Sequence, residues 1–122
     1  MRRVLSAVAV VLLGVLTLTA CGGGSSSSNG ADLPVKKIAI TFSGDDVTPN
    51  GTDIDIKVGQ PLEFDVTADK PGEIHVHSSP QQEFEYKAGS NQVISVDPIQ
   101  APGRVTVESH TLEKTLFILV AR

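Results

Sequence analysis

The segment Leu62-Glu63-Phe64-Asp65-Val66 alternates apolar and polar side chains at every position. A period of two is typical of a β-strand with one buried face, because successive side chains of a strand point to opposite sides. Outward from this segment, the same alternation recurs between residues 34 and 122. It predicts strands with these apolar residues on their buried faces: Ile38, Ile40 and Phe42; Ile54, Ile56 and Val58; Ile74 and Val76; Phe84 and Tyr86; Ile94 and Val96; Val105 and Val107.

Turn-forming residues separate the predicted strands. Gly, Pro, Asn, Asp and Ser cluster at residues 43–46, 59–61, 69–72, 88–91 and 98–103. About eight strands, with turns roughly every 8 to 12 residues, predict an all-β domain, an antiparallel β-sandwich with Greek-key connections, at residues 34–122. The last run, Leu116-Phe117-Ile118-Leu119-Val120, is apolar throughout, which predicts a central strand covered on both faces.

The N-terminal segment has the pattern of an export signal. Arg2 and Arg3 precede an apolar run, residues 4–18, that is too short to span a bilayer comfortably. The run leads into Leu18-Thr19-Ala20-Cys21, which resembles the lipobox of bacterial lipoproteins. That resemblance implies a signal peptide at residues 1–20 and a lipid on Cys21 that anchors the protein at the extracytoplasmic face of the cell membrane. An ordinary signal with an incidental cysteine, or an uncleaved anchor, is the alternative.

The segment from Gly22 to Asp32 has no large apolar side chain. Residues 21–33 are therefore expected to be the lipidated cysteine and a flexible Gly/Ser linker. Removal of the signal leaves 8 basic against 14 acidic residues, a net charge of −6, which argues against nucleic acid as a partner. The single cysteine also excludes an intrachain disulfide.

The three histidines have the most distinctive chemistry in the domain. His75 and His77 lie in the segment Glu73 to His77, so on a strand both project to the same side, with roots about 6.6 to 6.8 Å apart. His110 could supply a third nitrogen, as three-histidine zinc or copper sites require. Alternatively, His75 and His77 lie on a solvated sheet face and His110 in a loop, without a metal. Candidate hydrogen-bonding partners for the rings are Glu73, Glu108 and Ser109.

The order of motifs along the domain resembles the cupredoxin-like domains of bacterial, actinobacterial-type surface lipoproteins. In that resemblance a Glu-x-His-x-His strand, Glu73 to His77, precedes a Pro-Gly-x-x-x-Val-Glu segment, Pro102 to Glu108, and a final apolar strand, Leu116 to Val120. It covers nearly the whole domain from residue 35 to residue 122. The resemblance implies a cupredoxin-like sandwich, and it puts His110 in the region where cupredoxins carry metal ligands.

The chain departs from the cupredoxin pattern in its ligands. A type 1 copper site uses a cysteine thiolate, two histidines and usually a methionine, but the only cysteine here is Cys21 and the only methionine is Met1. Composition therefore excludes electron transfer through type 1 copper in this domain. The residues after the histidine strand, Ser78-Ser79-Pro80, also differ from the Gly-Tyr-Asp that is common in such lipoproteins.

The sequence predicts no catalytic site and leaves two functional hypotheses. Ser78, Ser79 and Ser109 lie near histidines in sequence, but no Gly-x-Ser-x-Gly elbow is present, so we expect no enzymatic activity. The preferred hypothesis is a membrane-tethered domain, without a cofactor, that binds an envelope protein or a small ligand. The alternative is an envelope protein that binds Cu(II) or Zn(II) through His75, His77 and His110.

Overall fold

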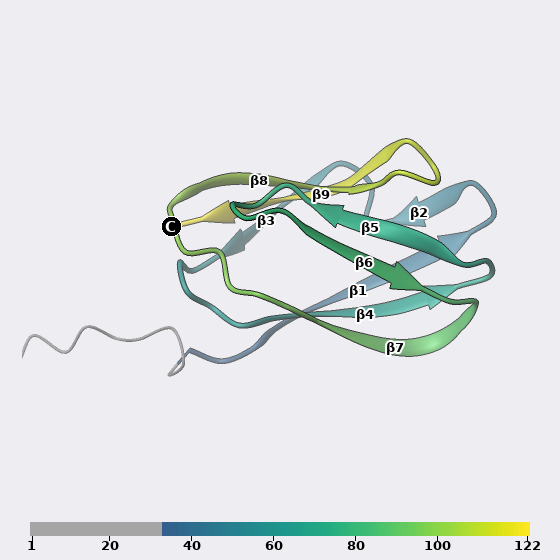
Figure 1. Ribbon diagram of the computed structural model, residues 1–122, viewed down its shortest axis with the longest axis horizontal. Helices are drawn as coiled ribbons and strands as arrows, with labels where there is room; N and C mark the ends of the chain where they lie inside the picture. The colour runs from purple at the N-terminus through teal and green to yellow at the C-terminus, as the bar shows by residue number, and fades with distance from the viewer. Residues whose placement is uncertain (1–32) are drawn as a thin grey trace, which may run out of the picture.

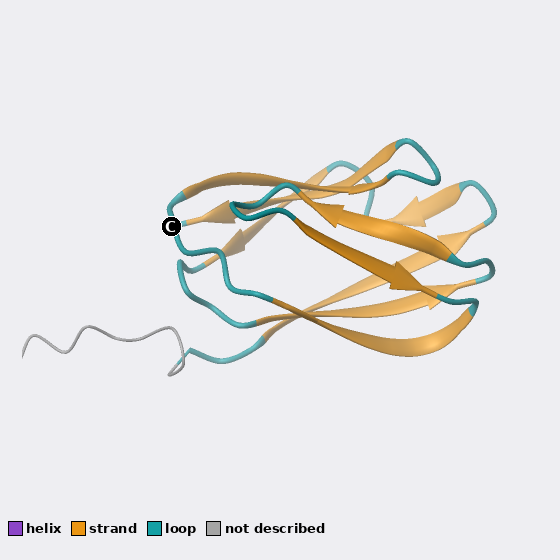
Figure 2. Cartoon of the chain, in the orientation of Figure 1, coloured by secondary structure: helices purple, strands orange, loops and turns teal. Residues whose placement is uncertain are grey.

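The computed structural model describes residues 33–122, so the predicted signal peptide, Cys21 and nearly all of the linker lie outside the described residues. The described part folds into nine strands (Figure 1, Figure 2). Within it, no helix is long and apolar enough to cross a membrane. The sequence pattern missed the strand around Val47, which is too short to show an alternation. The strands are β1 (Lys36–Ser43), β2 (Asp46–Thr48), β3 (Thr52–Ile56), β4 (Leu62–Ala68), β5 (Gly72–Val76), β6 (Gln82–Tyr86), β7 (Gly89–Val96), β8 (Gly103–Ser109) and β9 (Lys114–Ala121).

The strands form two sheets that face each other. One has the order β2-β1-β4-β7 and the other β3-β9-β8-β5-β6, which confirms the predicted β-sandwich. The expectation of purely antiparallel pairing is corrected for two pairs, because β1 pairs with β4 and β3 pairs with β9 in parallel. The chain passes to the other sheet as β3 before it returns as β4, beside β1. Side-chain alternation indicates which face of a strand is buried but not the direction of its neighbour.

Inward-facing apolar side chains from both sheets fill the space between them. Phe64 of β4 and Phe117 of β9 meet edge to face, with ring centroids 5.5 Å apart. Such an aromatic pair contributes about 0.5–1.5 kcal/mol beyond the area that it buries. The core follows the predicted alternation, and its fully buried members include Ile40, Leu62, Phe64, Val66, Ile74, Val76, Val107, Phe117 and Leu119.

Strand β9 is an interior strand, as predicted, but it is not covered on both faces. Ile118 and Val120 lie half-buried on the outer face of the five-stranded sheet. The inner face carries Phe117 and Leu119, which are fully buried. The apolar run therefore does not indicate a strand that is covered on both of its faces.

A β-bulge at Leu116 explains why the apolar run begins with two consecutive buried residues. Val107 of β8 pairs with Phe117, whereas the next residue, Glu108, pairs with Thr115, so Leu116 is an extra residue in β9. Leu116 and Phe117 can then both be fully buried although they are consecutive. The bulge also brings Thr115 to the side of the sheet on which Glu108 lies.

Candidate metal centre

Strand β5 and the residue that follows it, His77, place two histidines on the outer face of the five-stranded sheet, as the sequence predicted. The ring centroids of His75 and His77 lie 4.2 Å apart. The backbone N–H of His77 donates to the carbonyl of Thr106 in β8 at 2.9 Å, which holds this end of the strand against its neighbour. His75 is only 5% exposed although it faces away from the core. Polar neighbours on the same face, described below, therefore cover its ring.

His110 brings a third ring to this face from the turn between β8 and β9. The pairing of β5 with β8 sets Ile74 opposite Ser109, so the next residue, His110, lies near the beginning of β5. Its Nε2 lies 2.9 Å from Nδ1 of His75. One ligand nitrogen from each of the three histidines lies within 4.8 Å of the other two. The structure thus brings together all three predicted residues.

Two oxygen acceptors hold the rings of His75 and His77. Oε1 of Gln81 lies 3.2 Å from Nε2 of His75, and Oε2 of Glu108 lies 2.9 Å from Nε2 of His77. Both acceptors engage the same nitrogen of their ring, Nε2. The other nitrogen of each ring, Nδ1, is therefore left free of these two acceptors.

Two more carboxylates lie at the edge of the cluster. Glu83 is 3.8 Å from Nε2 of His75, and Glu73 is 4.0 Å from Nδ1 of His110. The sequence predicted Glu73 and Glu108 as neighbours of the rings but missed Gln81 and Glu83. Glu83 pairs directly with His75 across β5 and β6, a register that a single sequence does not reveal.

Ser109, also predicted to hydrogen-bond a histidine, lies on the other side of the sheet. It is fully buried, and its hydroxyl accepts from the backbone N–H of Leu112 at 3.3 Å. Burial raises the pKa of the neighbouring Tyr86 phenol, and a hydrogen bond with Ser109 offsets part of that rise. Ser109 fails as a partner because it alternates with Glu108 along β8, so it faces inward.

The cluster has the donor set of a small metal site. Copper and zinc bind imidazole nitrogens at about 2.0–2.1 Å, so two such nitrogens on one ion lie about 3.3–3.4 Å apart in a tetrahedron. The 2.9 Å separation of the His75 and His110 nitrogens is a hydrogen bond and needs to open by only about 0.5 Å for an ion to take the place of the proton. Three protein nitrogens leave a fourth position open on the exposed side, where 34% of the His77 and 52% of the His110 side chain is accessible.

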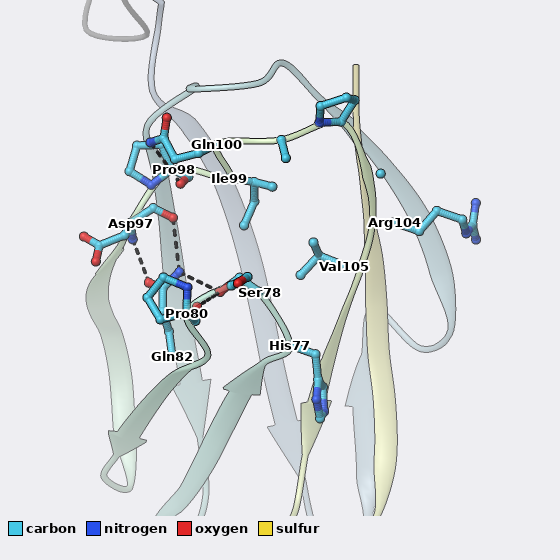
Figure 3. A pocket seen from close by; sticks show the side chains of 14 residues that line it. His77, Ser78, Pro80, Gln82, Asp97, Pro98, Ile99, Gln100, Arg104 and Val105 are labelled. Carbon is cyan, nitrogen blue, oxygen red and sulfur yellow. Dashed lines mark hydrogen bonds between the residues drawn. The ribbon is translucent and has the colours of Figure 1, made fainter.

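A separate hollow of about 590 Å³ lies between the β5–β6 and β7–β8 connections (Figure 3). Several of its polar groups form hydrogen bonds within the wall: the N–H of Asp97 donates to Oε1 of Gln82 at 2.8 Å, and the hydroxyl of Ser78 donates to a backbone carbonyl at 2.6 Å. His77 lies at its edge, with the ring directed away (Figure 3). The apolar side chains that line it are Pro80, Pro98, Ile99, Ala101, Pro102 and Val105.

Comparisons with known proteins bear on the fold. No protein-family model and no curated protein sequence matches the chain. Among solved structures it is similar to amicyanin from Paracoccus versutus, at 10% identity over 76% of this chain and 88% of that one, with a TM-score of 0.51. A Cu(I) amicyanin mutant gives 13% identity over 76% and 89% of the two chains, with a TM-score of 0.50. A purple cupredoxin from Nitrosopumilus maritimus gives 14% identity over 71% and 99%, with a TM-score of 0.49. The similarity to the two amicyanin structures shows that the chain has a cupredoxin-like β-sandwich fold.

Proposed function

We propose that this protein binds Cu(II) or Zn(II) through His75, His77 and His110 and that it is not an enzyme. The observation that carries the proposal is the convergence of one nitrogen from each ring to within 4.8 Å. Neutral imidazole is a preferred ligand of both ions, and three such ligands with an open fourth position make a recognised zinc or copper site. Metal binding, the alternative hypothesis from the sequence, is therefore the one that the geometry favours.

The proposed site differs from a type 1 copper centre. Its ligands are three imidazoles, whereas a type 1 centre needs a thiolate, and the only cysteine of the chain is Cys21. We therefore propose that the metal is bound without type 1 electron transfer. The Cu(I) amicyanin mutant shares the fold of this chain, which supports copper as the first metal to test.

We also propose that the domain is tethered to the extracytoplasmic face of the cell membrane through a lipid on Cys21. The support is the tandem arginines, the short apolar run and the lipobox-like Leu18-Thr19-Ala20-Cys21. Mass spectrometry of the membrane fraction should find a chain that begins at a diacylated Cys21. A soluble chain that retains Met1, or a Cys21→Ser variant that stays lipidated, contradicts the tether.

Calorimetric titration of the mature chain carrying Cys21→Ser tests the metal proposal, because this substitution removes a competing thiol outside the site. We expect one equivalent of Cu(II) or Zn(II) near pH 7.5. Affinity should weaken as the pH falls, because protons compete with the metal for the imidazole nitrogens. His77→Ala should lower affinity at least about tenfold. Weak binding that His75→Ala and His77→Ala leave unchanged contradicts the proposal.

A second candidate function, binding of a small apolar molecule, is favoured by the separate hollow. Its volume of about 590 Å³ lies within the usual range of small-molecule pockets, roughly 300–1,000 Å³. Ala101 lies on its wall and is exposed, so Ala101→Trp should fill the space without disturbing the core. A fluorescent apolar dye that binds the wild type and the variant equally well contradicts this candidate.

A further inference from the structure

We infer that Glu108 is a positioning residue, which fixes the proton of the neutral His77 ring on Nε2 and leaves Nδ1 free as the metal-binding nitrogen. The effect on metal affinity rests on the proposed function, whereas the position of the proton is a property of the metal-free protein. Both parts follow from the contacts of Glu108 on the outer face of the five-stranded sheet.

Glu108 is held at both of its oxygens. Oε2 lies 2.9 Å from Nε2 of His77, and Oε1 accepts a hydrogen bond of 3.4 Å from the hydroxyl of Thr115. About a third of the Glu108 side chain is exposed, as is about a third of that of His77. A carboxylate that is restrained from two sides on a paired strand offers a defined acceptor to the ring.

The chemistry of a carboxylate sets the tautomer. An ionised carboxylate only accepts hydrogen bonds, so the nitrogen that faces it must carry the proton of a neutral imidazole. For His77 that nitrogen is Nε2, and the lone pair is then on Nδ1. A ligating histidine that donates its other N–H to a carboxylate is a common arrangement, because this partner orients the ring and increases its basicity.

Gln81 produces the same result at the neighbouring ring. Its Oε1 faces Nε2 of His75, so this nitrogen donates and Nδ1 is left as an acceptor. Nδ1 of His75 is the atom that lies 2.9 Å from His110. His75 and His77 are therefore both prepared to bind through Nδ1, and His110 faces His75 with Nε2.

The β-bulge at Leu116 builds this arrangement into the fold. It places Thr115 opposite Glu108, while the neighbouring pair is Val107 with Phe117 in the core. In regular pairing without the extra residue, Leu116 would stand opposite Glu108 and Thr115 would occupy an inward position. The bulge thus exchanges a leucine for a hydroxyl donor beside the carboxylate.

Long-range ¹⁵N–¹H NMR of the metal-free mature chain with Cys21→Ser, recorded near pH 8, tests the tautomer directly. We expect the His77 ring to carry its proton on Nε2 in the wild type. Glu108→Ala should give a mixture of the two tautomers, and Thr115→Val a smaller shift in the same direction. A wild-type proton on Nδ1, or a spectrum that Glu108→Ala leaves unchanged, overturns the inference. The dispersion of backbone amide signals in the same samples reports whether each variant is folded.

Titration with Cu(II) and Zn(II) tests the consequence for binding. Glu108→Ala should weaken binding about 10- to 100-fold, and Glu108→Gln should restore most of it, because its amide oxygen can still accept from Nε2. The matched control is Glu85→Ala, which removes a negative charge from the exposed face of β6. Equal losses in Glu85→Ala and Glu108→Ala indicate that charge alone matters and overturn positioning. If the wild type binds neither ion, the proposed function fails, and the NMR measurement still decides the tautomer.

Discussion

The inner and outer faces of the five-stranded sheet are built on the same strands but held by different interactions. On the inner face, Val107 and Phe117 are fully buried in apolar surroundings. On the outer face, His75 is almost as buried at 5% exposed, yet its contacts are a second imidazole and an amide oxygen. Burial on this sheet therefore has two origins, apolar packing on one side and mutual coverage by hydrogen-bonded polar groups on the other.

The difference predicts how each face responds to substitution. Loss of an inner side chain removes apolar contacts and leaves a cavity, whose cost scales with its volume. Loss of an outer side chain removes one partner of a hydrogen bond, which costs less unless the other partner is left buried and unpaired. Stability should thus depend mainly on the inner face, and metal binding mainly on the outer face.

The largest contrast is expected between two consecutive residues of β9. Phe117→Ala should lower the free energy of unfolding by about 3–5 kcal/mol, because the ring is fully buried against Phe64. Ile118→Ala, on the half-buried outer face, should cost about 1 kcal/mol. Urea unfolding of both variants measures the difference. Equal costs would mean that the outer face of β9 is covered, as the sequence alone suggested.

Overpacking of the inner face should give the next largest effect. A Cβ on Gly72 would lie 2.3 Å from the Tyr86 hydroxyl oxygen, and this ring has little room because it stacks on Phe42. Gly72→Ala should therefore destabilise the domain by about 1–3 kcal/mol. The control is Glu73→Ala at the next position, which should change stability by less than about 0.5 kcal/mol. Thermal unfolding that ranks the two variants in the opposite order contradicts this reading of β5.

Among the histidines, the more buried ring should contribute more to stability, although both rings should contribute to metal binding. His75→Ala removes a ring that is hydrogen-bonded at both nitrogens, so it should cost about 1–2 kcal/mol. His110→Ala removes a half-exposed ring and should cost less than about 1 kcal/mol. Both variants should lose metal affinity. Chemical unfolding without metal, paired with calorimetry, checks each part, and equal stability losses would contradict the polar coverage of His75.

The smallest effect should come from an exposed ion pair on the outer face. A hydrogen bond from Arg104 holds the pKa of Asp53 below its usual value of 3.8. Because the folded pKa is lowered, the carboxylate contributes stability above its unfolded pKa, and this contribution disappears as the pH falls through the lowered folded pKa. NMR titration should show the Asp53 midpoint move back toward 3.8 in Arg104→Gln. An unchanged midpoint contradicts the assignment to Arg104.

The core and the candidate site were predictable from sequence to different extents. The alternation through Leu62, Phe64 and Val66 predicted the buried face of β4 correctly, because the side-chain period of a strand is a local property. His75 and His77 were predicted on one side of a strand for the same reason. Gln81 was not predicted, because its approach to His75 depends on the connection between β5 and β6.

Sequence by itself determined that residues 34–122 form an all-β sandwich, which residues point into its core, and that two histidines share a face. These are consequences of short-range stereochemistry and of the tendency of apolar side chains to leave water. Tertiary structure alone decided the parallel pairs β1–β4 and β3–β9, the bulge at Leu116, and the meeting of His110 with His75. Each of these depends on which distant strands pair and in what register, and that choice is made by the packing of the whole sandwich.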